Sequence, residues 1–394
     1  MMQKDMMEHA MTDRPARRNP FVLGQYVSPA YFCGRVKETD MLCQNLANGL
    51  NTVLLSPRRM GKTALIRHLF HQEDVSRHFH CLYVDIYSTH SFEELVCRLG
   101  QAVVRTFEHD PSCPAKLVEQ LRSLRFPLSR APANSAPSLD FSLHDICDPE
   151  RTLSEIFSFL QSLPKKTVIA IDEFQQIVRY RNTGTEAGIR SWLQRSNKAN
   201  MVFAGSDLHV LAPMFSSYDR PFYRSATFLP LNAIDKAVYR DFAEGQFARF
   251  GKVLPTDMFD DIYERFDGRT WYVHYVLNGL FSETPSAEAV TADALQRTIN
   301  NIQAVQASTF DNTLRSLSFK QKMLLMAIAK ENEASEMQGI EFCRRYGLGS
   351  PATVQTATKA LREKGLISKR GEAWCVEDFF FAQWMRKTYS LMSV

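Results

Sequence analysis

The sequence lacks any hydrophobic run long enough to cross a membrane. Its longest apolar stretches, such as MLLMAIA at residues 323–329, fall far short of the roughly 20 residues that span a bilayer. The first 20 residues mix acidic and basic side chains and contain no apolar segment of the kind found in signal peptides. We therefore expect a cytoplasmic protein with no membrane partner.

Cysteines are few and show no regular spacing. They lie at positions 33, 43, 81, 97, 113, 147, 343 and 375, and no two of them form a CxxC pair. Several of them lie in apolar strand or helix segments, as Cys81 does in HCLYVDIY. We expect reduced cysteines in the core of a cytosolic protein and no cysteine-bound metal.

Neither sign of charge is in large excess. Lysine and arginine together number 47 and aspartate and glutamate 43, which gives a net charge of +4 at pH 7. A charge this small does not by itself indicate a nucleic-acid partner. The 394 residues, of which 45% are hydrophobic, suffice for two or three globular domains with a full core.

The strongest local signal is SPRRMGKTAL at residues 56–65, which ends in Gly61-Lys62-Thr63 like a phosphate-binding loop. It departs from the pattern G-x-x-x-x-G-K-[ST] at the first position, where Ser56 replaces glycine. That position shapes the entry turn without touching phosphate, so a serine is tolerated where φ is compatible. A strand-length run before the loop and a helical apolar face after it favour a strand–loop–helix unit.

Such a unit predicts a nucleotide and magnesium as ligands. The loop presents backbone N–H groups at a helix N-terminus, where an anion is stabilised. Lys62 is expected to reach the β- and γ-phosphates, and Thr63 to place its hydroxyl on Mg²⁺. The nucleotide-binding residues would be Ser56, Pro57, Arg58, Arg59, Met60, Gly61, Lys62, Thr63 and Ala64.

An acidic pair supplies the second half of this site. The apolar run VIAI at residues 168–171 predicts a buried strand, and it ends in Asp172-Glu173. One carboxylate of such a pair can hold the magnesium shell, here Asp172, while Glu173 can polarise the attacking water. An apolar run ending in Asp-Glu is common by itself, but its place after a phosphate loop in one domain makes the interpretation strong.

Strand-like and helical segments alternate between residues 51 and 231. The strands are expected at 51–56, 80–89, 168–171, 199–207 and 225–231. This alternation predicts a five-stranded parallel α/β sheet with helices on both faces. Ligands bind such sheets at the carboxyl ends of the strands, where Ser206 also lies.

Composition divides the remainder of the chain. Residues 1–18 are expected to form a disordered arm, 19–231 the P-loop domain and 232–309 a helical lid. Within the P-loop domain, residues 125–150 are rich in Pro, Ser and Ala and predict an insertion or a mobile loop. Within the lid, the aromatic residues near Trp271 are interpreted as core side chains of a helical bundle.

Residues 310–394 show the pattern of a winged helix, with a helix at 351–364 and two strands joined at Arg370-Gly371. This segment holds 13 lysines and arginines against 9 acidic residues. Two partners stay open for it, duplex DNA and another protein. The side chains that could face a groove are Thr353, Gln355, Thr356, Lys359 and Arg362.

The motifs, taken in order, resemble the archaeal-type ATPases of the STAND branch of AAA+ P-loop proteins over residues 19–394. They read FCGRVKE, SPRRMGKTALI, YVDIYS, VIAIDEFQQI, VFAGSD, RPFYRSATFLPL, GRTWYVHYVLN and VEDFFFAQWMR. The resemblance implies ATP as the nucleotide and coupling of nucleotide state to assembly or to a partner. It also implies Lys62 and Thr63 as phosphate and magnesium ligands, Asp172 as the residue that orients magnesium, Glu173 as the catalytic base and Ser206 as a polar sensor.

An arginine that contacts the phosphates is less clearly placed. The family's arginine turn is split here between Arg220 and Arg224. We favour Arg220, because Pro221 fixes the backbone beside it and could aim it at the nucleotide of a neighbouring subunit in a homo-oligomer. Arg224 is expected to face its own subunit's site, and for both arginines a simple ion pair is the alternative.

Three functions remain in competition. The leading hypothesis is a Mg²⁺-dependent ATPase that acts as a nucleotide-driven switch with the winged helix as its output module. The alternative is a DNA-binding initiator or loader that resembles origin-recognition ATPases. A scaffold that binds ATP without hydrolysing it is disfavoured, because such a protein has no need of Glu173.

Overall fold

The computed structural model describes residues 19–24, 26–107, 148–181 and 184–389. The arm predicted at 1–18 and most of the insertion predicted at 125–150 lie outside these residues. The chain forms two compact units. The first comprises the described residues up to Gln246 together with Phe259–Asn278, and the second comprises Phe247–Met258 and the described residues from Gly279 onward.

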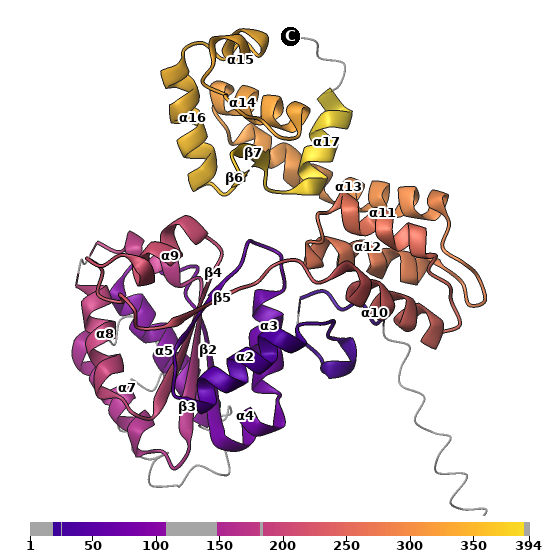
Figure 1. Cartoon of the computed structure of the whole chain (residues 1–394). Coiled ribbons are helices and arrows are strands. Elements are labelled where there is room, and N and C mark those ends of the chain that lie inside the picture. Colours follow the sequence, from indigo (N-terminus) through magenta and orange to yellow (C-terminus); the bar gives the residue numbers. More distant parts are fainter. Residues whose placement is uncertain (1–18, 25, 108–147, 182–183, 390–394) are drawn as a thin grey trace, which may run out of the picture. The chain divides into compact units, whose positions relative to one another are not determined.

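The first unit is built on a five-stranded parallel sheet (Figure 1). Its strands have the order β2-β3-β4-β1-β5. The fold class predicted from the sequence is confirmed. Strand β3, which lies between β2 and β4, is buried along almost its whole length, which is typical of a parallel sheet covered on both faces. The strands are β1 (Thr52–Leu55), β2 (Phe79–Asp85), β3 (Lys166–Asp172), β4 (Ala199–Gly205) and β5 (Thr227–Pro230).

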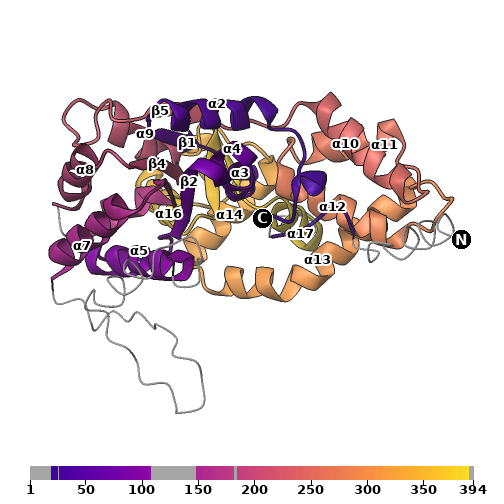
Figure 2. The same cartoon turned by 90° about the horizontal axis from the view of Figure 1, so that it is seen from below.

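Alternate residues of β1, β3 and β4 enter two separate cores. On β3, Ile169 and Ile171 belong to one core, whereas Val168 and Ala170 belong to the other. The first core is covered by α5 (Phe92–Phe107), α7 (Pro149–Ser162), α8 (Thr185–Arg195) and α9 (Leu208–Ser216). The second is covered by α2 (Val36–Ala47), α3 (Lys62–Phe70) and α4 (Glu73–His78). Helices α2 and α5 therefore lie on opposite sides of the strands (Figure 2).

Four helices follow the sheet. They are α10 (Lys236–Arg249), α11 (Thr256–Arg265), α12 (Thr270–Glu283) and α13 (Ala292–Arg315). The residues predicted as a helical lid are divided between the two compact units. The expected boundary between residues 309 and 310 falls inside α13, a continuous helix of 24 residues.

The carboxyl-terminal elements have the predicted helix and wing pattern. They are α14 (Phe319–Glu331), α15 (Ile340–Arg345), α16 (Pro351–Glu363), β6 (Ile367–Arg370), β7 (Ala373–Val376) and α17 (Phe379–Tyr389). Ser350 caps α16 by accepting a hydrogen bond from the Thr353 N–H. Strands β6 and β7 pair antiparallel around Gly371, whose φ of 56° is readily adopted by glycine. In the described part of the chain, no helix is long and apolar enough to span a membrane.

Candidate functional site

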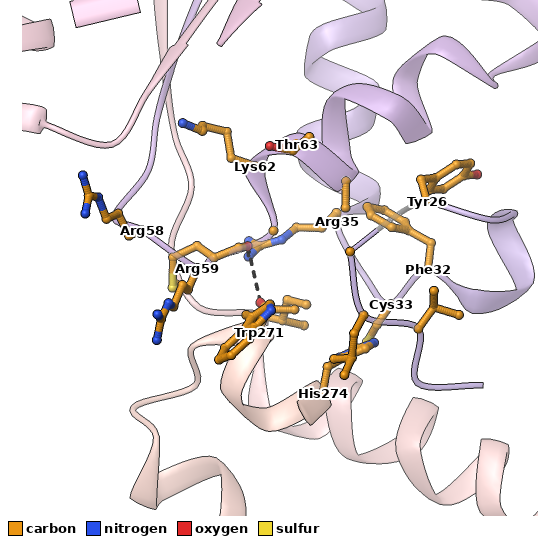
Figure 3. A pocket seen from close by; sticks show the side chains of 18 of the residues that line it. Tyr26, Phe32, Cys33, Arg35, Arg58, Arg59, Lys62, Thr63, Trp271 and His274 are labelled. Carbon is orange, nitrogen blue, oxygen red and sulfur yellow. Dashed lines mark hydrogen bonds between the residues drawn. The ribbon is translucent and has the colours of Figure 1, made fainter. Parts of the chain in front are cut away.

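A pocket of about 470 Å³ opens at the carboxyl ends of the strands, within the first unit (Figure 3). This volume is typical of a small-molecule site. Its walls are residues 57–64 of the loop, parts of segment 22–35, and side chains from the ends of β3 and β4 and from the start of α12. The loop predicted from sequence to bind phosphate is therefore one wall of this pocket.

The loop leaves β1 and enters α3 through a left-handed turn. Gly61 precedes α3 with a φ of 87°, and Arg59 also has a positive φ, of 68°. Gly61 supplies no capping side chain, so the first N–H groups of α3 remain available to a ligand. Ser56 is fully buried and does not have a positive φ, which explains why glycine is not required at this first position.

The lysine of the loop lies between two carboxylates. Lys62 Nζ is 2.7 Å from Asp172 Oδ1 and 2.9 Å from Glu173 Oε1. The Thr63 hydroxyl donates to Asp172 Oδ2 at 2.8 Å, and the Tyr83 hydroxyl donates to the same oxygen at 2.8 Å. The four residues proposed for phosphate, magnesium and base chemistry thus meet in space, although the strand and the loop are more than 100 residues apart.

Glu173 is held by further neutral donors. The Ser206 hydroxyl donates to Glu173 Oε2 at 2.8 Å, so the fifth predicted residue also belongs to the cluster. The side-chain amide of Gln175 donates to the same oxygen at 2.5 Å. Glu173 itself has a φ of 57°, an uncommon backbone conformation for a residue other than glycine and one found at functional sites.

Both carboxylates are ionised in this cluster. Burial acts to raise the pKa of Asp172, but the Lys62 ammonium and the hydrogen bonds from Lys62, Tyr83 and Thr63 outweigh it and lower that pKa. Burial likewise acts to raise the pKa of Glu173, and Lys62, with the hydrogen bonds from Gln175 and Ser206, lowers it instead. The cluster of Lys62, Asp172 and Glu173 therefore holds one cation and two anions.

The donor set fits magnesium. Mg²⁺ prefers hard oxygen ligands and commonly binds proteins through one or two carboxylates together with substrate phosphates. Thr63 and Asp172 offer a hydroxyl and a carboxylate in direct contact. Among the described residues, no group of three or more His, Cys, Asp or Glu side chains could hold a metal without further ligands.

Two arginines connect the loop to neighbouring segments, Arg35 from outside the loop and Arg59 from within it. Arg35 is buried and donates from Nη2 to the Met60 carbonyl at 3.0 Å. The Arg59 guanidinium lies 4.6 Å from the centroids of both the Trp271 and Tyr272 rings. The Arg59 carbonyl accepts a hydrogen bond from the Trp271 N–H at 3.0 Å. The loop is thus tied to the start of α12 by a cation–π contact and a backbone bond.

Part of the pocket lining is apolar and includes Phe32, Cys33 and Ile234. His274 also lines it, and burial lowers the pKa of its imidazole to about 4, so the ring is neutral at pH 7. Trp271, interpreted from sequence as a core aromatic, lines the pocket, while the neighbouring Tyr272 is fully buried.

The two candidate arginines lie apart from this cluster. Arg220 forms an ion pair with Glu186 on α8. Arg224 is exposed and stacks over the Tyr223 ring at 5.1 Å. Neither arginine lines the pocket. The structure therefore places Arg220 on a carboxylate of its own chain, which was the ion-pair alternative.

Sequence reasoning missed four residues of the site, namely Tyr83, Gln175, Arg35 and Trp271. Tyr83 and Gln175 lie within motifs that were recognised, YVDIYS and VIAIDEFQQI. Both residues lie near the carboxyl end of a strand, and this position could have indicated that they belong to the site. Arg35 follows the turn at Gly34, and only its contact with the loop reveals its role.

Comparison with known proteins supports the same architecture. Residues 308–387 match a family model described as "Probable winged helix domain". No curated protein sequence matches the chain.

Solved structures resemble nearly the whole chain. A Walker-type ATPase of Pyrococcus abyssi matches with a TM-score of 0.64 at 18% identity, over 93% of this chain and 99% of that one. The ORC2 protein of Aeropyrum pernix, solved with ADPNP and ADP, matches with a TM-score of 0.58 at 14% identity, over 95% and 98%. The ORC1 protein of the same organism, solved with DNA, matches with a TM-score of 0.53 at 15% identity, over 94% of this chain and 96% of that one. The chain has the AAA+ fold with a carboxyl-terminal winged helix.

Proposed function

We propose that the protein is a Mg²⁺-dependent ATPase that acts as a nucleotide-driven switch, with the winged helix as its output module. One observation carries this proposal: Lys62, Thr63, Asp172, Glu173 and Ser206 meet in one cluster at the mouth of a pocket lined by the loop. A fold shared with a Walker-type ATPase supports it. The apolar side chains in the pocket lining suit a purine base, and adenine is proposed from the family resemblance.

Each residue of the cluster has a task in hydrolysis. Lys62 exchanges its carboxylate partners for the β- and γ-phosphates when ATP binds. Thr63 and Asp172 would hold Mg²⁺, which when bound neutralises charge on the phosphates. Glu173 accepts a proton from the attacking water, and Ser206 holds the carboxylate that does so. The eight loop residues that line the pocket would surround the phosphates with N–H groups and positive charge.

The domain division belongs to the same proposal. We assign residues 19–231 to the ATPase domain, 232–309 to a helical lid and 310–394 to the output module, with membership of the STAND branch of AAA+ proteins. The Arg59 contact with Trp271 supports a coupling between the phosphate loop and α12, because a change in loop conformation must move both.

Nucleotide binding and hydrolysis by the purified full-length protein test the central proposal. We expect Mg²⁺-dependent ATP binding and turnover, measured with and without duplex DNA. Binding without turnover under both conditions would favour the scaffold hypothesis over the ATPase.

An initiator or loader that binds DNA is the second candidate, and two observations favour it. The fold is shared with an ORC1 protein solved with DNA. On α16, the side chains of Gln355, Thr356, Lys359 and Arg362 are all exposed along the helix. A helix of this kind can enter the major groove while its cations contact phosphates.

Lys359→Ala tests that candidate. If Lys359 contacts a phosphate, the variant should weaken duplex binding and reduce the slope of log K against log salt concentration by about 1. Fluorescence anisotropy with the full-length protein over a salt series measures this slope. Lys330→Ala, which removes an exposed lysine from α14, serves as the control. An unchanged slope in the Lys359 variant would indicate that α16 contacts protein instead.

We propose that Arg220 acts on the nucleotide of a neighbouring subunit, which requires the protein to form a homo-oligomer. For Arg220 to do so, it must leave Glu186. An arginine that stabilises the transferring phosphoryl group contributes in the transition state, so its loss lowers turnover far more than binding. We therefore expect Arg220→Ala to lower hydrolysis at least tenfold with little change in ATP affinity, and Arg224→Ala to do less.

Two comparisons separate this role from a structural ion pair. Glu186→Gln breaks the same ion pair but keeps the arginine, so hydrolysis should be retained. Mixing Arg220→Ala with Lys62→Ala subunits should restore part of the activity, because each supplies what the other lacks. Equal losses in the Arg220 and Glu186 variants, without restoration on mixing, would show that Arg220 only partners Glu186.

A further inference from the structure

Gln175 makes an unusual pair of contacts for a buried amide. It lies in η3 (Phe174–Arg179), directly after the acidic pair, and only 8% of it is exposed. Its Nε2 donates to Glu173 Oε2, yet its Oε1 is buried and has no hydrogen-bond partner among the described residues. Burying an unpaired amide oxygen costs stability that an apolar side chain of the same shape would not cost. Folding alone therefore does not explain a glutamine here.

The space occupied by this amide depends on Gly205, the last residue of β4. A Cβ atom at position 205 would lie 2.0 Å from Gln175 Oε1 and 3.1 Å from its Cδ. Any larger side chain on this residue would push the amide away from Glu173. Because Gly205 has no side chain, the Gln175 amide has room to reach the Glu173 carboxylate.

The donors to Glu173 divide between its two oxygens. Lys62 contacts Oε1, whereas Gln175 and Ser206 both donate to Oε2. When Lys62 turns to the phosphates of a bound nucleotide, Oε1 loses its partner and Oε2 keeps both of its own. The carboxylate then stays in place with one oxygen anchored and the other available to accept a proton.

We propose that Gln175 is a positioning residue that anchors Glu173 Oε2, so that Oε1 takes the proton of the attacking water. This inference rests on the proposed ATPase function. In the step concerned, the water oxygen bonds to the γ-phosphorus while the bond from that phosphorus to the bridging oxygen of ADP breaks. The water proton passes to Glu173 Oε1 and afterwards returns to solvent. Gln175 touches neither water nor phosphate.

The test replaces the amide with a side chain of similar length. Gln175→Met removes the donor to Glu173 and also the unpaired buried oxygen. We expect kcat to fall at least tenfold, ATP affinity to stay within threefold of wild type, and the thermal midpoint to be unchanged or higher. A purely structural glutamine would not give slower turnover in an equally or more stable protein.

The adjacent glutamine supplies a matched control. Gln176 lies in the same short helix, is 7% exposed, and donates from Nε2 to the Thr89 carbonyl at 3.0 Å instead of to Glu173. Gln176→Met should therefore lower the thermal midpoint and keep kcat. Gly205→Ala displaces the Gln175 amide without altering it and also presses on Leu211, whose Cδ2 would lie 2.9 Å from the new Cβ. It should reproduce the fall in kcat at retained ATP affinity, together with a lower thermal midpoint.

A double variant distinguishes failure of this inference from failure of the proposed function. Because Gln175 acts through Glu173, adding Gln175→Met to Glu173→Gln should cause no further loss of turnover. If Gln175→Met has the wild-type kcat while Glu173→Gln is slow, only the role of Gln175 is overturned. The same holds if the losses of turnover from the two substitutions add up in the double variant. Glu173→Gln at wild-type turnover overturns the proposed function and the inference with it.

Discussion

Replacing Lys62 with alanine is expected to abolish ATP binding. The ammonium group is the cation of the cluster, and without it the β- and γ-phosphates would face Asp172 and Glu173 with no positive charge between them. Lys62 lowers the pKa values of both carboxyl groups, so the variant also leaves two buried carboxylates with neutral hydrogen-bond donors but no cation beside them. Repulsion between these carboxylates and the phosphates, together with the loss of the Lys62 contact, should therefore weaken ATP binding.

Isothermal titration calorimetry with ATP and Mg²⁺ measures this effect. Lys37→Ala, which removes an exposed lysine of α2 outside the pocket, should bind ATP like wild type. Circular dichroism of both variants shows whether the fold is retained. If folded Lys62→Ala protein binds ATP within about threefold of wild type, a difference worth only ~0.7 kcal/mol, the loop is not a phosphate site.

Replacing Glu173 with glutamine is expected to separate ATP binding from ATP hydrolysis. Glutamine keeps the size of the side chain and can still accept hydrogen bonds from Ser206 and Gln175 through its carbonyl oxygen. It cannot take a proton from water, so turnover should fall by roughly 10²-fold or more while ATP still binds. The loss of one negative charge beside Lys62 gives no reason for weaker phosphate binding.

Steady-state hydrolysis and equilibrium binding, measured on the same preparation, give the two quantities. Asp85→Asn is a suitable control, because Asp85 is exposed at the end of the neighbouring strand β2 and does not line the pocket. This control should leave both quantities unchanged. Hydrolysis at the wild-type rate in Glu173→Gln would remove that residue from the role of base.

Much of the first unit follows from local patterns in the sequence. Alternation of apolar strand segments and amphipathic helices specifies a parallel sheet, because each strand of that kind must be covered on both faces. Once the sheet is parallel, its strand ends share one edge. For this reason the loop at 56–64, the acidic pair and Ser206 could be placed together before any distance was known.

Other parts of the site depend on contacts that no local pattern encodes. Tyr83 reaches Asp172 across 89 residues of sequence, and Arg59 reaches Tyr272 across 213. Which side chain fills the space beside Gly205 depends on how η3 packs against β4. Arg220 is another example. Its neighbour Pro221 suggested that the side chain points towards the nucleotide of a neighbouring subunit, whereas its contact with Glu186 depends on the position of α8.

The sequence by itself determined the class of sheet, the phosphate loop, the acidic strand end and the winged-helix pattern at the carboxyl terminus. Each of these is a short-range periodicity or a fixed spacing, and the backbone geometry of strands and helices converts it directly into a position. Only the tertiary structure decided that Lys62 lies between Asp172 and Glu173, that Gln175 and Ser206 share Glu173 Oε2, and that Arg220 is bound to Glu186. Those pairings are selected by side-chain packing and charge between distant segments, because a side chain bonds whichever partner the folded chain brings within about 3 Å.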